Sequence, residues 1–142
     1  MRVLWFTNTS SCYREQSGKG YNGGGWISSL EEEIKKNNDI ELGVCFYSIN
    51  AITPEKEEQK GTFYYILPRP KKTLYYSLIT ILGKDEQSSE IQEKIVIPAL
   101  LDVVNDFKPD IIHVFGSENI YGLLSSYIKI PLILHIQGIL FP

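Results

Sequence analysis

The chain has 142 residues, which is enough for one domain with its own hydrophobic core. With 43% hydrophobic and 22% charged residues, its composition is typical of a globular protein rather than a disordered one. The net charge of -3 provides no basic surface for a phosphate backbone, so the composition argues against nucleic acid as a partner.

The cysteines and the hydropathy pattern indicate the cellular compartment of the protein. Cys12 and Cys45 lie far apart, and neither has a second cysteine or a histidine at the spacing of metal ligands. We therefore expect two free thiols in a reducing cytosol and no bound metal. The apolar run after Arg2 is too short for a signal peptide, and no stretch approaches the ~20 apolar residues of a membrane-spanning helix. The sequence predicts a cytoplasmic protein.

The first part of the chain combines a strand, a glycine-rich loop and a helix. Residues 3–6 are apolar, residues 18–25 are rich in glycine, and residues 26–34 repeat apolar side chains at helical spacing. A strand that leads through glycines into a helix presents backbone N–H groups and the positive end of the helix dipole to a ligand. We expect an apolar stripe facing the sheet and charged residues facing water, namely Trp26, Ile27, Leu30 and Ile34 inward and Glu31, Glu33, Lys35 and Lys36 outward.

The remaining elements alternate between strands and helices. We expect strands at residues 39–47, 62–67, 110–115 and 131–136, and helices at residues 89–107 and 119–128. The first of these helices should kink or restart at Pro98, and Ser117 is suited to cap the second. Residues 48–60 are polar and indicate a solvated loop. The strands are apolar on both faces, which favours an α/β fold, a Rossmann-like parallel sheet with helices on both faces, in one domain over residues 1–142.

Residues 68–82 have no clear pattern. A basic tip at residues 68–72 precedes a short apolar stretch that carries tyrosines. The shortness of that stretch and the small positive cluster favour a helix packed on the sheet edge. Peripheral contact with a membrane surface is the alternative.

Polar or glycine-bearing segments stand where the predicted strands end. In a parallel sheet, ligands bind beyond the carboxyl ends of the strands, near the switch in strand order. The segments at those ends begin at Asn8, at the glycine turn 23–25, at residues 116–118 and at residues 135–138. We therefore predict a binding site on this rim of the sheet.

Motifs for nucleotide cofactors and metals are incomplete. Residues 18–23 match G-x-G-x-x-G, but a loop separates them from the first strand, and the second strand ends without an acidic residue for a ribose. A dinucleotide-dependent oxidoreductase is therefore disfavoured. No D-x-D motif occurs, so no divalent metal is indicated. We expect His113 to be a hydrogen-bonded core residue, whereas a core role and a site role stay equally open for His135.

Four segments, taken in order, resemble a known family. They are residues 1–8, 23–30, 108–118 and 131–138. Together they are similar to the N-terminal half of retaining, GT-B-fold glycosyltransferases of family 4, which transfer a sugar from a nucleotide-sugar donor. In that family the N-terminal domain mainly receives the acceptor, and the C-terminal domain holds most of the donor. The resemblance implies a nucleotide-sugar co-substrate and no other cofactor.

The resemblance also implies roles for residues on the predicted rim. The substrate-binding residues would be Asn8, Gly23, Gly24, Gly25, Gly116, Ser117, Glu118 and Gly138. Family members often carry a histidine directly before the glycine that follows the fifth strand. Here Gln137 holds that place and His135 lies two residues earlier on the same strand face, so the catalytic assignment stays open between them.

The C-terminal domain of such enzymes, with its basic residues for the leaving diphosphate, is missing from these 142 residues. We therefore expect a fragment, incomplete at its C-terminal end and inactive alone, of an enzyme that transfers a hexose to a polysaccharide or lipid-linked acceptor. The alternative is a stand-alone α/β module that binds a nucleotide or docks on a partner without catalysis.

Overall fold

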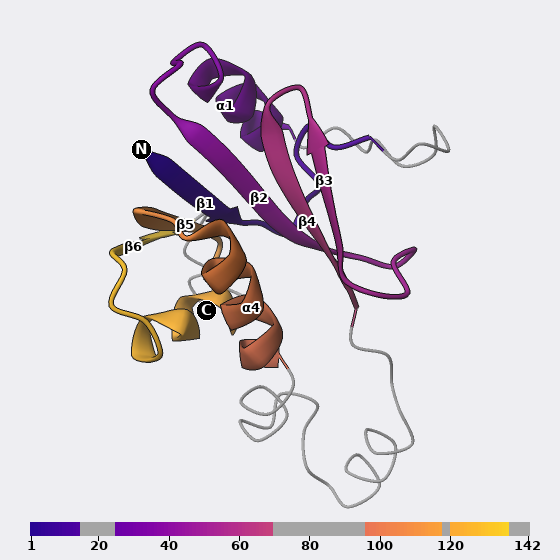
Figure 1. Ribbon diagram of the computed structural model, residues 1–142, viewed down its shortest axis with the longest axis vertical. Helices are drawn as coiled ribbons and strands as arrows, with labels where there is room; N and C mark the ends of the chain where they lie inside the picture. Colours follow the sequence, from indigo (N-terminus) through magenta and orange to yellow (C-terminus); the bar gives the residue numbers. More distant parts are fainter. Residues whose placement is uncertain (15–24, 70–95, 118–119, 137–142) are drawn as a thin grey trace, which may run out of the picture.

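The computed structural model describes residues 1–14, 25–69, 96–117 and 120–136 (Figure 1). The fold is a six-stranded sheet with the strand order β3-β4-β2-β1-β5-β6. The strands are β1 Arg2–Phe6, β2 Glu41–Ser48, β3 Glu55–Gln59, β4 Thr62–Pro68, β5 Ile111–Phe115 and β6 Leu132–His135. The helices are α1 Trp26–Ile34, α4 Ile97–Phe107 and the 3-10 helix η2 Ile120–Ser126.

The five predicted strands are all present and all parallel. β1 pairs with β2 on one side and with β5 on the other, while β4 and β6 extend the sheet outward from them. Parallel neighbours need crossover connections, and α1 joins β1 to β2 in this way. The prediction of a Rossmann-like α/β fold is therefore confirmed, with β1 at the switch in strand order.

The predicted solvated loop at residues 48–60 is wrong in its second half. Glu55–Gln59 forms the edge strand β3, antiparallel to β4. The hairpin turns at Lys60 and Gly61, with φ of 51° and 80°, and two consecutive positive φ values are the mark of a tight type I′ turn. Charged side chains are common on edge strands because they discourage pairing with other chains. Here the charged sequence led to the prediction of a loop instead of a strand.

Helices cover both faces of the sheet, as predicted. α4 and η2 pack on one face, where Leu4, Phe107 and Leu124 belong to the same buried cluster (Figure 1). α1 and the loop after β1 cover the other face, in a cluster that includes Trp5 and Ile27. No helix in the described part of the chain is long and apolar enough to cross a lipid bilayer.

The helices after β4 differ in detail from the predictions. α4 begins at Ile97 with Pro98 in its first turn, where the missing N–H of proline costs no helical hydrogen bond. This agrees with a restart at that residue, while residues 89–95 lie outside the described residues. The helix predicted at residues 119–128 is a 3-10 helix instead. It contains Gly122, and the hydroxyl of Ser125 donates to the Gly122 carbonyl at 2.9 Å, so local bonding replaces α-helical pairing.

α1 has the predicted bounds, but one charged side chain lies on the opposite face from the one expected. Ile27, Ser28 and Glu31 are buried, so Glu31 faces the sheet and not water. Trp26, predicted to face the sheet, is 46% exposed. Glu31 can be buried because hydroxyl and amide donors from neighbouring segments surround its carboxylate, a condition that the helical pattern alone does not reveal.

Candidate functional site

The carboxyl ends of the five parallel strands lie along one rim of the sheet, as predicted. Hydrogen bonds continue to this rim: Thr7 N–H donates to the Cys45 carbonyl at 3.0 Å, and Gly116 N–H donates to the His135 carbonyl at 2.8 Å. Asn8 and Ser117 directly follow the bonded Thr7 and Gly116. The structure thus places Asn8, Gly116, Ser117 and His135 on one rim.

The other predicted site residues fall into two groups. Gly25 stands at the N-cap of α1 with φ of 52°, a left-handed conformation that favours glycine. The next residue, Trp26, contacts side chains at the ends of β5 and β6, so the start of this helix lies at the same rim. The remaining residues, Gly23, Gly24, Glu118, Gln137 and Gly138, lie outside the described residues, and their roles stay predictions.

A polar pocket of about 290 Å³, hereafter the rim pocket, opens beyond the ends of β1, β2 and β4. It is lined by residues 8–10, Tyr13, residues 46–50 and Arg69. The lining therefore combines residues with amide, hydroxyl and guanidinium groups and the aromatic residues Tyr13, Phe46 and Tyr47. Such a mixture of oriented polar groups and apolar surface is what a small-molecule site needs.

Hydrogen bonds of ordinary length fix the walls of the rim pocket. Asn50 N–H donates to Ser48 Oγ at 3.1 Å, and Arg69 N–H donates to the Ser48 carbonyl at 3.1 Å. On the opposite wall, Tyr13 N–H donates to the Ser10 carbonyl at 3.0 Å. The backbone of each wall is thus defined by bonds within or between the strand ends.

The loop after β1 is also held against the sheet by side chains. The Tyr13 ring is buried 5.4 Å from the Phe46 ring and 5.2 Å from the Tyr64 ring, measured between centroids. From the other face, the Tyr121 hydroxyl donates to the Thr7 carbonyl at 3.3 Å. The loop that presents Asn8 is therefore anchored on both faces of the sheet.

A second group of side chains, the aromatic cluster, lies on β5 and β6 beside the start of α1. It consists of Trp26, His113, Phe115 and His135. The Trp26 ring lies 4.9 Å from the His135 ring, and the His113 and Phe115 rings stack at 4.0 Å. Trp26 and His135 are exposed, so their faces can stack on the ring of a ligand. The exposed position of His135 excludes a core role, and its site role stays a prediction.

His113 is the more buried histidine of the aromatic cluster. Its Nε2 atom is buried and has no hydrogen-bond partner among the described residues, so the expected hydrogen-bonded core role is only half met. Burial, and secondly the nearby His135, lower the pKa of His113 below its ordinary value of 6.5. Its imidazole is therefore neutral at pH 7. Within the described residues, no group of three potential metal-ligating side chains occurs.

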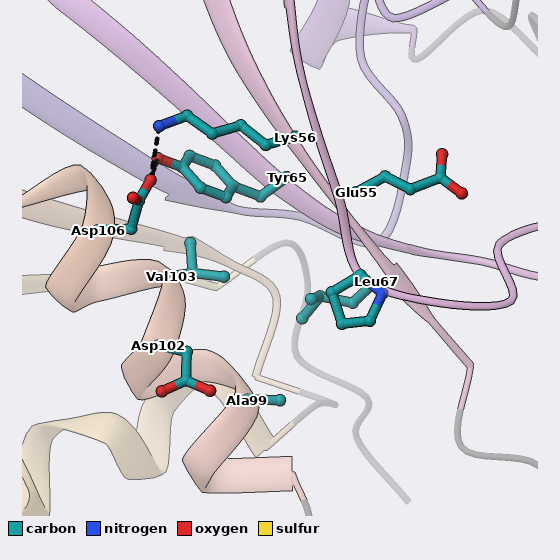
Figure 2. A pocket seen from close by; sticks show the side chains of 9 residues that line it. Glu55, Lys56, Tyr65, Leu67, Ala99, Asp102, Val103 and Asp106 are labelled. Carbon is teal, nitrogen blue, oxygen red and sulfur yellow. Dashed lines mark hydrogen bonds and ion pairs between the residues drawn. The ribbon is translucent and has the colours of Figure 1, made fainter.

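An unrelated pocket of about 270 Å³ lies between the β3–β4 hairpin and α4 (Figure 2). Lys56 Nζ lies 2.6 Å from Asp106 Oδ2, which also accepts a hydrogen bond from the Tyr65 hydroxyl at 2.5 Å. None of the sequence-predicted site residues lines this pocket. Its polar contacts join the hairpin to α4, which is a structural role.

Sequence reasoning missed several residues of the site. Arg69 and Asn50 line the rim pocket, and Trp26 belongs to the aromatic cluster. The rule that pointed to Asn8 also applies to the ends of the second and third predicted strands, so it could have found residues 48–50 and Arg69. Trp26 was assigned to the apolar stripe because its spacing fits a helix face.

Comparison with known proteins adds information on the fold. No protein-family model matches the chain, and no curated protein matches it. Two solved structures are similar in fold. One is UDP-GlcNAc 2-epimerase from Neisseria meningitidis bound to UDP-GlcNAc, with a TM-score of 0.50 and 19% identity over 94% of this chain. The other is an α,α-trehalose-phosphate synthase (UDP-forming) from Burkholderia vietnamiensis, with a TM-score of 0.56 and 13% identity over 96% of this chain.

The chain spans 32% of the length of each of these two proteins. At such low identity the likeness concerns the fold alone. The name of each neighbour includes UDP. The chain therefore has the α/β fold of the N-terminal half of a GT-B enzyme.

Proposed function

We propose that the chain is the acceptor-binding domain of a nucleotide-sugar glycosyltransferase. The observation that carries this proposal is the rim pocket, a polar concavity at the carboxyl ends of β1, β2 and β4. The GT-B-type fold and the sequence resemblance to family 4 both favour an N-terminal, acceptor-side role. Amides and hydroxyls such as those of Asn8 and Ser48 are suited to hydrogen-bond the hydroxyls of a sugar.

The donor is assigned to a second domain outside these residues. The two structural neighbours are about three times as long as the matched region, since the chain covers 32% of each. A nucleotide sugar would then bind across the rim, with the start of α1 near its phosphates. In this arrangement Gly25 allows close approach of the backbone, and the aromatic cluster faces the reacting sugar.

His135 is the catalytic candidate that the structure describes, and Gln137 is the second. Gly116 and Ser117 line the acceptor side with Asn8, together with the substrate-binding residues Gly23, Gly24, Glu118 and Gly138. The acceptor is a growing polysaccharide or a lipid-linked glycan, and the site of action is cytoplasmic, at the membrane surface for a lipid-linked acceptor.

Calorimetric titration of the chain with UDP-glucose and UDP-GlcNAc tests whether the nucleotide-sugar donor binds outside this domain. Because the donor is assigned to another domain, we expect no saturable binding with a Kd below about 1 mM. A micromolar Kd for either nucleotide sugar would contradict the acceptor-side assignment.

The alternative, a module that docks on a partner without catalysis, has one observation in its favour. Ile133 and Leu134 on the edge strand β6, and Ile136 directly after it, are exposed by 51%, 43% and 56%. Apolar side chains on an edge strand are suited to a protein contact. The coding sequence after residue 142 separates the two functions, since a following donor-type domain supports the transferase and a stop codon supports the module.

A further inference from the structure

The rim pocket has an unusual charge pattern for this protein. The chain as a whole carries 17 acidic and 14 basic residues, yet Arg69 is the only charged residue among the described residues that line the pocket. No carboxylate from that lining competes for its guanidinium. The described lining of the rim pocket therefore carries one positive charge and no negative one.

Arg69 is well placed to act on a ligand. It directly follows β4, and its N–H donates to the Ser48 carbonyl at 3.1 Å, which fixes its main chain at the mouth of the pocket. Arg69 is exposed, so a ligand can reach its side chain from solvent.

Neutral hydrogen-bond donors line the rim pocket together with Arg69. Ser48 Oγ accepts the Asn50 N–H at 3.1 Å, and this leaves the Ser48 hydroxyl proton as a donor. The Ser10 hydroxyl and the Asn8 amide come from the opposite wall. A guanidinium with several neutral donors is the chemistry that recognises phosphate or carboxylate, because the planar fork can pair two oxygens at once.

The size of the rim pocket limits its ligand. Its volume of about 290 Å³ lies just below the range of about 300–1,000 Å³ found for small-molecule sites. This suits a single sugar with one anionic group better than an entire nucleotide sugar. The volume of the rim pocket and the charge of Arg69 therefore both indicate a single sugar with one anionic group.

We propose that the rim pocket binds an anionic group, a phosphate or a carboxylate, carried by the sugar acceptor, with Arg69 as its charge partner. The acceptor identity rests on the proposed function, whereas the recognition of an anionic sugar rests on the pocket itself. Asn8 and Ser48 hydrogen-bond the same anionic group or the adjoining sugar hydroxyls.

Amide NMR of the isotope-labelled 142-residue chain tests this inference. The probes are glucose 1-phosphate, glucuronate and uncharged glucose. We expect at least one of the two anionic sugars to shift the amides of residues 8–10 and 48–50, with an affinity about tenfold or more above that of glucose. A stronger effect of glucose 1-phosphate assigns a phosphate, and a stronger effect of glucuronate assigns a carboxylate.

Substitutions identify the charge partner. Arg69→Gln should weaken binding of the anionic sugar about tenfold while the response to glucose stays unchanged, and Arg69→Lys should give an intermediate loss because it keeps the charge but not the fork. Lys129→Gln is the control, since Lys129 is an exposed cation that precedes β6 at its amino end. The thermal midpoint of each variant shows whether it is folded.

Three outcomes would overturn the inference. Glucose and both anionic sugars could bind equally well, or none of the three could bind. A folded Arg69→Gln variant could also bind the anionic sugar as tightly as the parent chain. These outcomes differ from the failure of the proposed function. The proposed function fails if a nucleotide sugar binds with a micromolar Kd. If a neutral sugar shifts the same amides and Arg69→Gln does not change that shift, the acceptor role stands and only the recognition of an anionic group is refuted.

Discussion

The Glu31 carboxylate accepts a hydrogen bond from Thr62 Oγ1 at 3.1 Å in the interior, where α1 meets the start of β4. The Glu31 side chain is fully buried, and its other partners are the Cys12 N–H at 3.0 Å, Lys35 Nζ at 2.5 Å and the Tyr64 hydroxyl. A buried carboxylate with this many donors joins the helix, the sheet and the loop after β1. Because that loop forms a wall of the rim pocket, Glu31 positions the site without contacting it.

Replacing Glu31 by Gln should destabilise the domain. The amide keeps the shape of the side chain but loses charge-assisted hydrogen bonds, and its own N–H₂ donors face other donors. We expect the free energy of unfolding to fall by about 2 kcal/mol, measured by urea denaturation. The matched control is Glu33→Gln on the same helix, where the pair with Lys36 is exposed and the change should stay below about 0.5 kcal/mol. Equal effects of the two substitutions would show that the buried Glu31 carboxylate contributes no more to stability than the exposed Glu33 carboxylate.

The stability of the domain should depend on acid pH through Glu31. Burial alone would raise the pKa of this carboxyl, but hydrogen bonds from Lys35, from Tyr64 and from the Cys12 N–H outweigh it and hold the pKa below its ordinary value of 4.5. The folded state thus binds this proton less readily than the unfolded state. The stabilisation is fully present above about pH 4.5 and is lost as the pH falls through the folded-state pKa. Urea midpoints between neutral and acid pH should fall less steeply for Glu31→Gln than for the parent chain. Parallel curves would contradict this.

Gly43 of β2 should not tolerate a side chain. A Cβ at this position would lie 3.0 Å from two ring atoms of Phe107 and 3.1 Å from Leu4 Cδ1. Both neighbours are fully buried and belong to the cluster beneath α4, so they have little room to move. Gly43→Ala is expected to lower the free energy of unfolding by about 1–3 kcal/mol. Thermal or urea denaturation measures this, and an unchanged midpoint would mean that α4 shifts freely on the sheet.

The pKa of His113 should depend on burial and on its neighbour His135. Burial first, and the proximity of His135 second, lower the pKa of His113 below 6.5. An NMR titration of the imidazole protons should therefore place the His113 midpoint below that value. In His135→Gln the second cause disappears, so the midpoint should rise but stay below 6.5, since burial remains. A midpoint above 6.5 in either protein would contradict the buried position of His113.

The parallel sheet could be predicted because its strands are apolar on both faces. The runs at β1, β2, β4, β5 and β6 carry that pattern directly, and the rule for carboxyl ends then placed Asn8 and His135 on the correct rim. β3 was missed because an edge strand needs no apolar face. Its Glu55–Gln59 sequence pairs through the backbone after a tight turn at Lys60 and Gly61.

The charged and polar parts of the site depend on tertiary contacts that a linear pattern does not contain. Glu31 was expected in water because it lies off the apolar stripe of its helix, and its burial depends on donors from β4 and from the loop after β1. Arg69 enters the site through the pairing of β4 with β2, which brings it beside Ser48. Likewise, the contact of Trp26 with His135 joins segments far apart in sequence.

The central claim is that the rim pocket receives a sugar acceptor and that the nucleotide-sugar donor binds elsewhere. The most direct measurement is a parallel amide NMR titration of the 142-residue chain with UDP-glucose and with a panel of simple sugars and sugar acids. The account predicts that a member of the panel shifts residues 8–10 and 48–50, while UDP-glucose gives no saturable shift below about 1 mM. Saturation of those amides by micromolar UDP-glucose, with no response to any simple sugar, would contradict it.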